Sequence, residues 1–179
     1  MCIRDSYSAY LLQGGLQLPD REYYLADSEH ARQLRARYQT HIAAILKLAG
    51  FTDTDARAIR ILELEHAVAE THRSLADNEN IHNANNTWTQ ADFSVKAPGL
   101  DWAEYFRAAG INQQGSFMVW QPEAFKGESA LVVSIPLNTW KDWLALDVYK
   151  RQIQGAIGQN RRSADGLMMS CLLYTSRCV

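Results

Sequence analysis

The feature that most constrains the fold is a pair of long helix-forming segments joined by a short turn. The first begins at Ser28, a favoured N-cap residue, and ends at Gly50, a residue type that often follows the last helical turn. The second runs from Thr52 or Asp53 to about Leu75. The apolar residues that recur at three- and four-residue steps, and that we expect to be buried, are Leu34, Tyr38, Ile42, Ile45 and Leu46 in the first segment and Ala56, Ile59, Leu62, Leu64, Val68 and Leu75 in the second. Two consecutive amphipathic helices with so short a connection predict an antiparallel helix pair.

The other landmarks predict short helices and little sheet. A short helix is expected around Phe93, and Asp101 is placed to cap another. Residues 117–120 (FMVW) form the one convincing strand, whereas residues 130–134 (ALVVS) fit either a strand or a helix. Pro136 suits the first turn of a final helix that we expect to end near residue 146. We therefore predict a mainly α lobe with a minor β element.

Three short segments, which we call the adapter-like segments, resemble translated DNA of the kind added when sequencing libraries are built. Residues 1–6 (MCIRDS), residues 147–152 (DVYKRQ) and the start of residues 171–179 (CLLYTS) can be encoded by one transposon-end sequence, read in different frames or as its reverse complement. Segments of such origin are set aside when a fold is predicted. We therefore expect residues 7–146 to be one natural stretch and residues 153–170 to be a second stretch of unassigned identity.

Composition excludes several classes of protein. A net charge of −2 argues against a nucleic-acid-binding surface, which normally carries a clustered basic face. No apolar run approaches the length of a transmembrane helix. The three cysteines, Cys2, Cys171 and Cys178, all lie in or beside the adapter-like segments, so the natural stretch offers neither a disulfide framework nor a thiolate site.

Residues 13–25, QGGLQLPDREYYL, resemble a signature of the neprilysin family of zinc metallopeptidases, Q-G-G-L-G-L-P-D-R-D-Y-Y-L, with Gln17 and Glu22 as departures. Further matches to the family's large helical lobe follow in the same order. They are Tyr38, His41, Leu46-Lys47-Leu48, Leu64-Glu65 and Ala69 and, in resemblance to a bacterial branch, Asn85-Asn86-x-Trp88, Asp92-Phe93, residues 96–102 (KAPGLDW), residues 119–122 (VWQP) and Pro136-Leu137-x-Thr139-Trp140-Lys141-Asp142. The resemblance covers residues 7–146.

The resemblance implies that residues 7–146 are part of the family's N-terminal, non-catalytic helical domain, which encloses the substrate cavity. In that family an H-E-x-x-H helix and a downstream Glu of the C-terminal lobe hold the zinc. These motifs do not occur in this sequence, so no catalytic and no metal-binding residue is assigned. The parent is expected to be a bacterial zinc metalloendopeptidase that cleaves oligopeptides and is exported to the periplasm or cell envelope. Its cofactor would be zinc, and the catalytic lobe would be the partner that this chain lacks.

Two pairs of residues on the second predicted helix are candidates for chemistry of their own, one for a zinc site and one for an acid–base pair. His66 and His72 are six residues apart, which places them roughly 120° apart around a helix of about 3.6 residues per turn. Zinc-binding histidines on one helix need a spacing of four. Glu63 and Glu65 point in different directions, whereas a general acid and a general base must converge. We expect solvated or structural roles for the histidines and a solvated face for the glutamates.

Arg21 and Trp120 are the two candidates for contact with substrate. Asp20 and Arg21 are expected chiefly to lock the turn that presents Tyr23 and Tyr24, with a cavity-lining role for Arg21 as the alternative. Trp120 ends the predicted strand, in a region that lies near the interior of the enclosure in the family. The other four tryptophans are expected to be core residues.

The sequence leaves two other function classes open. One is a non-enzymatic α-helical binding or scaffold domain, and the other is a small self-sufficient hydrolase, which lacks a convergent nucleophile or metal set. If the chain is instead a fragment of a peptidase, the uninterrupted gene should continue past Leu146 into an H-E-x-x-H segment. A lobe without its partner should also expose an apolar patch.

Overall fold

A computed structural model describes residues 9–79 and 85–158 of the chain, with side chains described as far as Arg151. These residues divide into two compact units, which are described separately below. The sheet unit comprises residues 9–15, 71–79 and 85–134, and the helical unit comprises residues 16–70 and 135–158.

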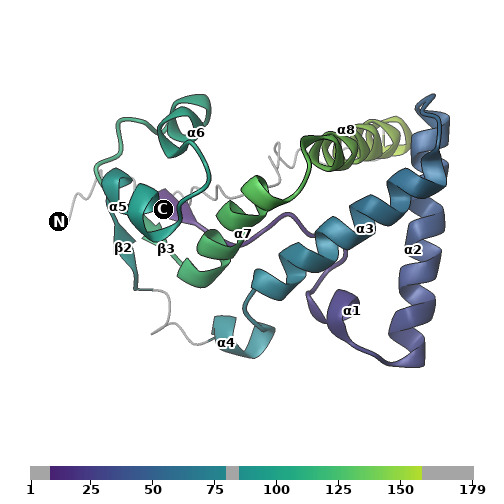
Figure 1. The fold of residues 1–179 in the computed structure, drawn as a ribbon, viewed down its shortest axis with the longest axis horizontal. Coiled ribbons are helices and arrows are strands. Elements are labelled where there is room, and N and C mark those ends of the chain that lie inside the picture. The colour runs from purple at the N-terminus through teal and green to yellow at the C-terminus, as the bar shows by residue number, and fades with distance from the viewer. Residues whose placement is uncertain (1–8, 80–84, 159–179) are drawn as a thin grey trace. The chain divides into compact units, whose positions relative to one another are not determined.

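The sheet unit contains a small mixed sheet (Figure 1). Its strands are β1 (Ala9–Leu11), β2 (Thr87–Trp88) and β3 (Phe117–Val119), in the order β1-β3-β2. β3 lies parallel to β1 and antiparallel to β2. The strand predicted at residues 117–120 is confirmed as β3, although it ends one residue earlier. β1 and β2 were not predicted, because two or three residues are too few to show a periodic pattern.

Short helices make up the rest of the sheet unit. Thr89 and Asp92 form a capping box at the start of α5, and the Asp101 side chain accepts a hydrogen bond from the backbone N–H of Glu104 at the start of α6. The helix expected around Phe93 and the helix expected after Asp101 are both confirmed. The ambiguous residues 130–134 are helical and form the end of α7. The helices of this unit are α4 (Leu75–Glu79), α5 (Gln90–Lys96), α6 (Trp102–Ala108) and α7 (Pro122–Ser134).

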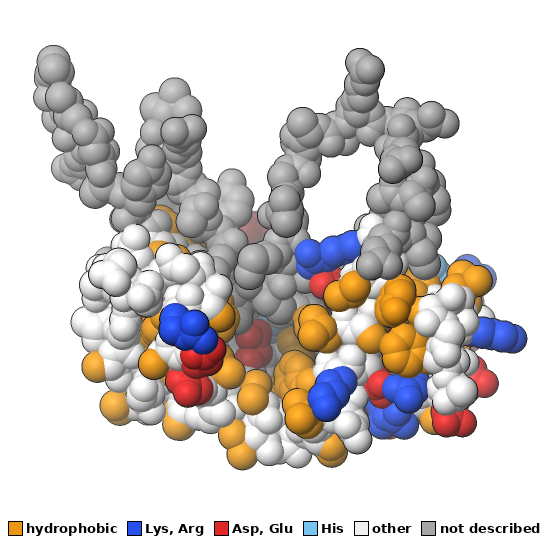
Figure 2. Space-filling model, turned by 90° about the horizontal axis from the view of Figure 1, so that it is seen from above, with side chains coloured by type: hydrophobic (Ala, Val, Ile, Leu, Met, Phe, Trp, Pro, Cys, Tyr) orange, Lys and Arg blue, Asp and Glu red, His pale blue; other side chains and the backbone are white. Residues whose placement is uncertain are grey.

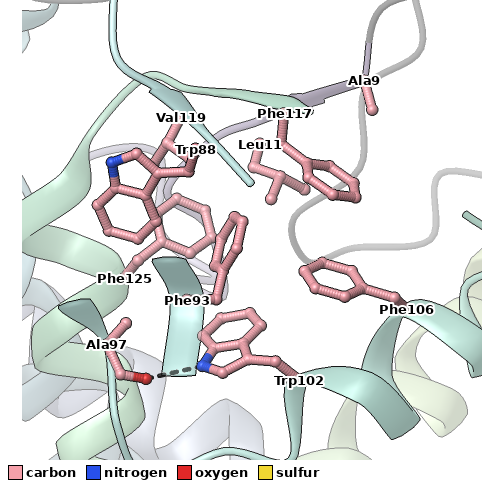
Figure 3. Close-up of a cluster of buried hydrophobic side chains, with 10 residues drawn as sticks. All are labelled: Ala9, Leu11, Trp88, Phe93, Ala97, Trp102, Phe106, Phe117, Val119 and Phe125. Atoms are coloured by element: carbon pink, nitrogen blue, oxygen red, sulfur yellow. Dashed lines mark hydrogen bonds between the residues drawn. The ribbon is translucent and has the colours of Figure 1, made fainter. Parts of the chain in front are cut away.

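Aromatic side chains fill the core between the sheet and these helices. The ring of Phe93 lies 4.8 Å from that of Trp102, 4.9 Å from that of Trp88 and 5.1 Å from that of Phe106, measured between centroids. The Trp102 indole N–H donates to the backbone oxygen of Ala97 at 2.7 Å, which satisfies the one polar atom of that side chain. Figure 3 shows the cluster: Ala9, Leu11, Trp88, Phe93, Ala97, Trp102, Phe106, Phe117, Val119 and Phe125.

Four helices form the helical unit: α1 (Glu22–Leu25), α2 (Glu29–Leu48), α3 (Thr54–Thr71), which reaches one residue into the sheet unit, and α8 (Leu137–Gly158). The Ser28 side chain caps α2 by accepting from the backbone N–H of Ala31, and Gly50 follows α2 with a φ of 84°, as the sequence predicts. The chain reverses direction between α2 and α3, but Figure 1 shows the two helices diverging from that turn. Leu146 of α8 completes the core that they share; its other buried members are Ile42, Ile45, Leu46, Ala58 and Ile61.

The predicted buried face of α3 is partly wrong. Leu64 and Val68 are buried as expected, but Ile59 is 44% exposed and Ala58 and Ile61 are buried instead. Apolar residues occur on more than one side of this helix, so spacing alone did not determine which side faces the core.

The predicted end of this helix is also wrong. α3 ends at Thr71, and Leu75 begins the separate helix α4, where its side chain is 63% exposed. The Ser74 hydroxyl accepts from the backbone N–H of Asp77 at 3.2 Å, so Ser74 caps a new helix.

The final helix is longer than predicted. α8 begins after Pro136, as expected, but continues through residues 147–152 to Gly158. The assignment of those six residues to adapter-derived sequence stays a prediction. Within residues 9–79 and 85–158, no helix has the length and apolar character needed to cross a bilayer.

Candidate functional site

The most extensive polar site of the helical unit surrounds the carboxylate of Glu65, which is fully buried. The Tyr24 hydroxyl donates to Glu65 Oε2 at 2.8 Å, and the Tyr38 hydroxyl lies 2.9 Å from the same oxygen. The Trp143 indole N–H donates to Glu65 Oε1 at 3.1 Å. Three hydrogen-bond donors therefore converge on one carboxylate.

Each helix of this unit supplies one member of the site. Tyr24 comes from α1, Tyr38 from α2, Glu65 from α3 and Trp143 from α8. The Tyr24 hydroxyl also accepts from the backbone N–H of Leu18 at 2.9 Å, which attaches the Gly-Leu-Gln-Leu-Pro segment to the site. The site, which we call the Glu65 site, is thus a polar junction of four helices.

Burial dominates the electrostatics of the Glu65 site. It raises the pKa of Glu65 from its ordinary value of 4.5 to about 7, although the donors from Tyr24, Tyr38 and Trp143 and the charge of Lys150 act in the opposite direction. Burial and the nearby charge of Glu65 also raise the pKa of both tyrosines. The expectation of a solvated face is therefore wrong for Glu65, because its neighbours supply the hydrogen bonds that water would otherwise make.

Glu63 follows the prediction, because it is exposed. Glu63 and Glu65 do not converge, so they do not form a general acid and base pair. With three donors around a fully buried carboxylate, the Glu65 site is suited to holding helices together.

A second polar network lies in the sheet unit and involves the start of the QGG motif. The Gln13 side chain accepts from the backbone N–H of Arg73 at 2.8 Å and donates to the backbone oxygen of the same residue at 3.1 Å. The backbone N–H of Gln13 donates to the side chain of Gln121 at 2.9 Å. The glutamine of the motif therefore ties the chain after β1 to the chain after α3.

His72 belongs to this second network. Its Nε2 lies 3.0 Å from the backbone oxygen of Gly14 and 3.1 Å from Glu128 Oε1. Burial raises the pKa of Glu128, and the hydrogen bond from His72 acts against that shift. Of the two roles expected for the histidines, solvated or structural, His72 has the structural one.

The described histidines do not fit a zinc site. His66 is exposed, and its Nδ1 lies 3.9 Å from Glu70 Oε1, while His30 and His41 are also exposed. His82 lies outside the described residues. Across the described part of the chain, no group of three or more His, Cys, Asp or Glu residues is arranged to hold a metal ion. No catalytic step through zinc can therefore be derived from these residues.

The two candidates for substrate contact lie in different units. Arg21 precedes α1, is half-buried, and its Nε lies 3.6 Å from Glu22 Oε1. The neighbouring Asp20 accepts from the backbone N–H of Glu22 at 2.9 Å, so Asp20 does stabilise the turn before Tyr23 and Tyr24. Trp120 is half-buried, and its ring lies 6.4 Å from that of Tyr10. A substrate-binding role for either residue stays a prediction.

The tryptophans only partly follow the expectation of core positions. Trp88 and Trp102 are buried in the aromatic core, whereas Trp140 and Trp143 of α8 are half-buried. The hydrogen bond from Trp143 to Glu65 was not predicted. The one signal was the place of Trp143 on a helix with apolar residues on several sides, which does not identify a partner.

Comparisons with known proteins agree with this architecture. Peptidase family M13 matches residues 3–165 of the chain. Endothelin-converting enzyme 1 of Rattus norvegicus is 26% identical over 178 residues, which are 92% of this chain and 22% of that protein. Neprilysin-3 of Drosophila melanogaster is 25% identical over 150 residues, which are 75% of this chain and 19% of that protein.

The fold also resembles that of solved structures. The zinc metalloprotease Zmp1 of Mycobacterium tuberculosis in its open state gives a TM-score of 0.71 at 21% identity, over 91% of this chain and 30% of that one. The inhibitor complex of Zmp1 gives a TM-score of 0.71 at 23% identity, over 89% of this chain and 26% of that one. The chain therefore spans between 19% and 30% of the length of these relatives. Since the match to the family's N-terminal domain covers most of the sequence, the chain belongs to peptidase family M13, the zinc metallopeptidases of neprilysin and endothelin-converting enzyme.

Proposed function

We propose that this chain is part of the lobe that encloses the substrate cavity of a bacterial zinc metalloendopeptidase. The parent enzyme hydrolyses oligopeptides, and its C-terminal lobe supplies the zinc and the chemistry. The parent is exported to the periplasm or cell envelope. The chain itself contributes walls of the enclosure and no catalytic group.

The observation that carries this proposal is the family match over residues 3–165 in a sequence without H-E-x-x-H. The family is a family of peptidases, which supports a peptide substrate for the parent. The half-buried Arg21 and Trp120 are the positions at which this chain would touch that substrate.

Peptidase assays on the chain and on its parent test the proposal. The purified chain is expected to leave a fluorogenic oligopeptide uncut, with or without added zinc, and to lose zinc on dialysis. The parent, expressed from the uninterrupted gene, is expected to cut the peptide and to be inhibited by 1,10-phenanthroline. Stoichiometric zinc retention or zinc-dependent hydrolysis by the chain would contradict the proposal. A parent without peptidase activity would favour the scaffold alternative.

A further inference from the structure

Helix α8 carries apolar residues on two opposite sides. Leu146 is buried in the core that α8 shares with α2 and α3, and Asp142 is buried on the same side, where it binds Arg57 and Arg60 of α3. At about 100° per residue, Leu137 and Leu144 lie roughly 180° around the helix from Leu146. A helix that is apolar on both sides is normally covered on both sides.

The outer side of α8 is uncovered in this chain. Leu137 is 66% exposed and Leu144 is 56% exposed. Figure 2 shows the molecule from above, and hydrophobic side chains gather in it over the region where α8 lies in Figure 1. Val148, which is 43% exposed, extends the same side into residues 147–152.

The spacing on the outer side is that of a helix–helix contact. Leu137, Trp140 and Leu144 follow one another at steps of three and four residues, the pattern by which one helix packs along another. Trp140 lies between the two leucines on this side, because residues three and four apart are neighbours on a helix surface. The exposed Lys141 flanks the row.

Trp140 also presents an unsatisfied donor. Its indole Nε1 is buried and has no hydrogen-bond partner among the described residues. A buried N–H without an acceptor is costly, so such groups are normally paired in a complete structure. That atom has no accessible surface in this chain, so the row of Leu137, Trp140 and Leu144 calls only for a neighbour that offers apolar side chains.

We propose that Leu137, Trp140 and Leu144 form a seam that is covered by an apolar helix of the parent polypeptide outside this chain. The inference rests on the proposed function. We assign the covering helix to the parent polypeptide because this chain corresponds to only 30% of Zmp1 and 22% of endothelin-converting enzyme 1. The covering helix carries apolar residues at steps of three and four and an acidic residue opposite the exposed Lys141.

Cysteine labelling at Leu144 tests the seam. Cys2, Cys171 and Cys178 of the chain are replaced by serine, as are any cysteines of the parent expressed from the uninterrupted gene. Leu144→Cys is then introduced into both proteins. In the chain, the new thiol is expected to react with a maleimide as an exposed thiol does. In the parent, the reaction should be about tenfold slower or more, because a covered residue reacts only through local opening. Leu146→Cys, which replaces a buried residue, is the matched control and should react slowly in both proteins.

The outcomes separate the seam from the proposed function. Equal labelling of Leu144→Cys in the chain and in a parent with zinc-dependent peptidase activity would overturn the seam and leave the function intact. Protection that appears in the chain alone and grows with its concentration would assign the seam to a second copy and overturn the proposed occupant. Protection in a parent that lacks peptidase activity would support the seam and overturn the function.

Discussion

The substitution Glu65→Gln should change the pH dependence of stability. Glu65 is fully buried, and its pKa is raised from 4.5 to about 7 in the folded protein. Glutamine has nearly the same shape but no charge, so it retains the packing and removes the titration. The comparison of the two proteins therefore isolates the cost of burying this one charge.

The sign follows from the direction of the shift. A carboxyl group whose pKa is raised by folding binds its proton more tightly in the folded state, so it stabilises the fold at low pH and loses that contribution as the pH rises. The contribution is fully present below about pH 4.5 and is lost by about pH 7. Each pKa unit between the two states corresponds to about 1.4 kcal/mol, so the free energy of unfolding changes by about 3 kcal/mol across this range.

Urea unfolding followed by tryptophan fluorescence, from pH 4 to pH 8, measures this effect. The free energy of unfolding of the unmodified protein minus that of Glu65→Gln should fall by about 3 kcal/mol between pH 4.5 and pH 7. Other groups titrate equally in both proteins and cancel in the difference. Glu63→Gln, at an exposed position two residues away, is the control and should show no such trend. A difference that is flat with pH, or that rises with pH, would refute the reasoning, because a rise would mean that the three donors outweigh burial.

Two further substitutions test contacts in each unit. Tyr24→Phe removes a donor to the Glu65 carboxylate and the acceptor of the Leu18 N–H. It should therefore destabilise the protein by about 1–3 kcal/mol and speed hydrogen exchange at the Leu18 amide. An unchanged exchange rate at Leu18 would contradict this expectation. Gly99→Ala should destabilise by about 2 kcal/mol or more, because a Cβ there would lie 2.3 Å from the backbone oxygen of Ser129 and Gly99 has a φ of +126°. Gly115→Ala meets no atom within 4 Å and is the control, expected to change the midpoint of urea unfolding little.

Local signals in the sequence predicted much of the helical fold. Ser28 and Asp101 act as the N-caps that their residue types favour, and Gly50 follows α2 in a left-handed conformation. These features depend on a few neighbouring residues, so they can be recognised without knowledge of the rest of the chain. The strands β1 and β2 could not be recognised in this way, because each is defined by pairing with the distant β3.

The buried polar sites were the least predictable part. Glu65 was expected to be solvated because it does not converge with Glu63 on an acid–base pair. The spacing of these two residues, however, does not indicate which side of α3 meets the core. Its environment comes from Tyr24, Tyr38 and Trp143, which are far from it in the sequence. The family resemblance included Glu65 and both tyrosines among its matched positions, but it did not indicate that they are hydrogen-bonded to one another.

Long-read sequencing of the gene around residues 7–146 tests most directly the claim that this chain is a non-catalytic part of an M13 peptidase. We expect the reading frame to continue beyond the codon for Leu146, without the adapter-like residues 147–152, into an H-E-x-x-H segment and a downstream Glu. A stop codon soon after that position would contradict it. So would an intact transcript that encodes all 179 residues with the three adapter-like segments included.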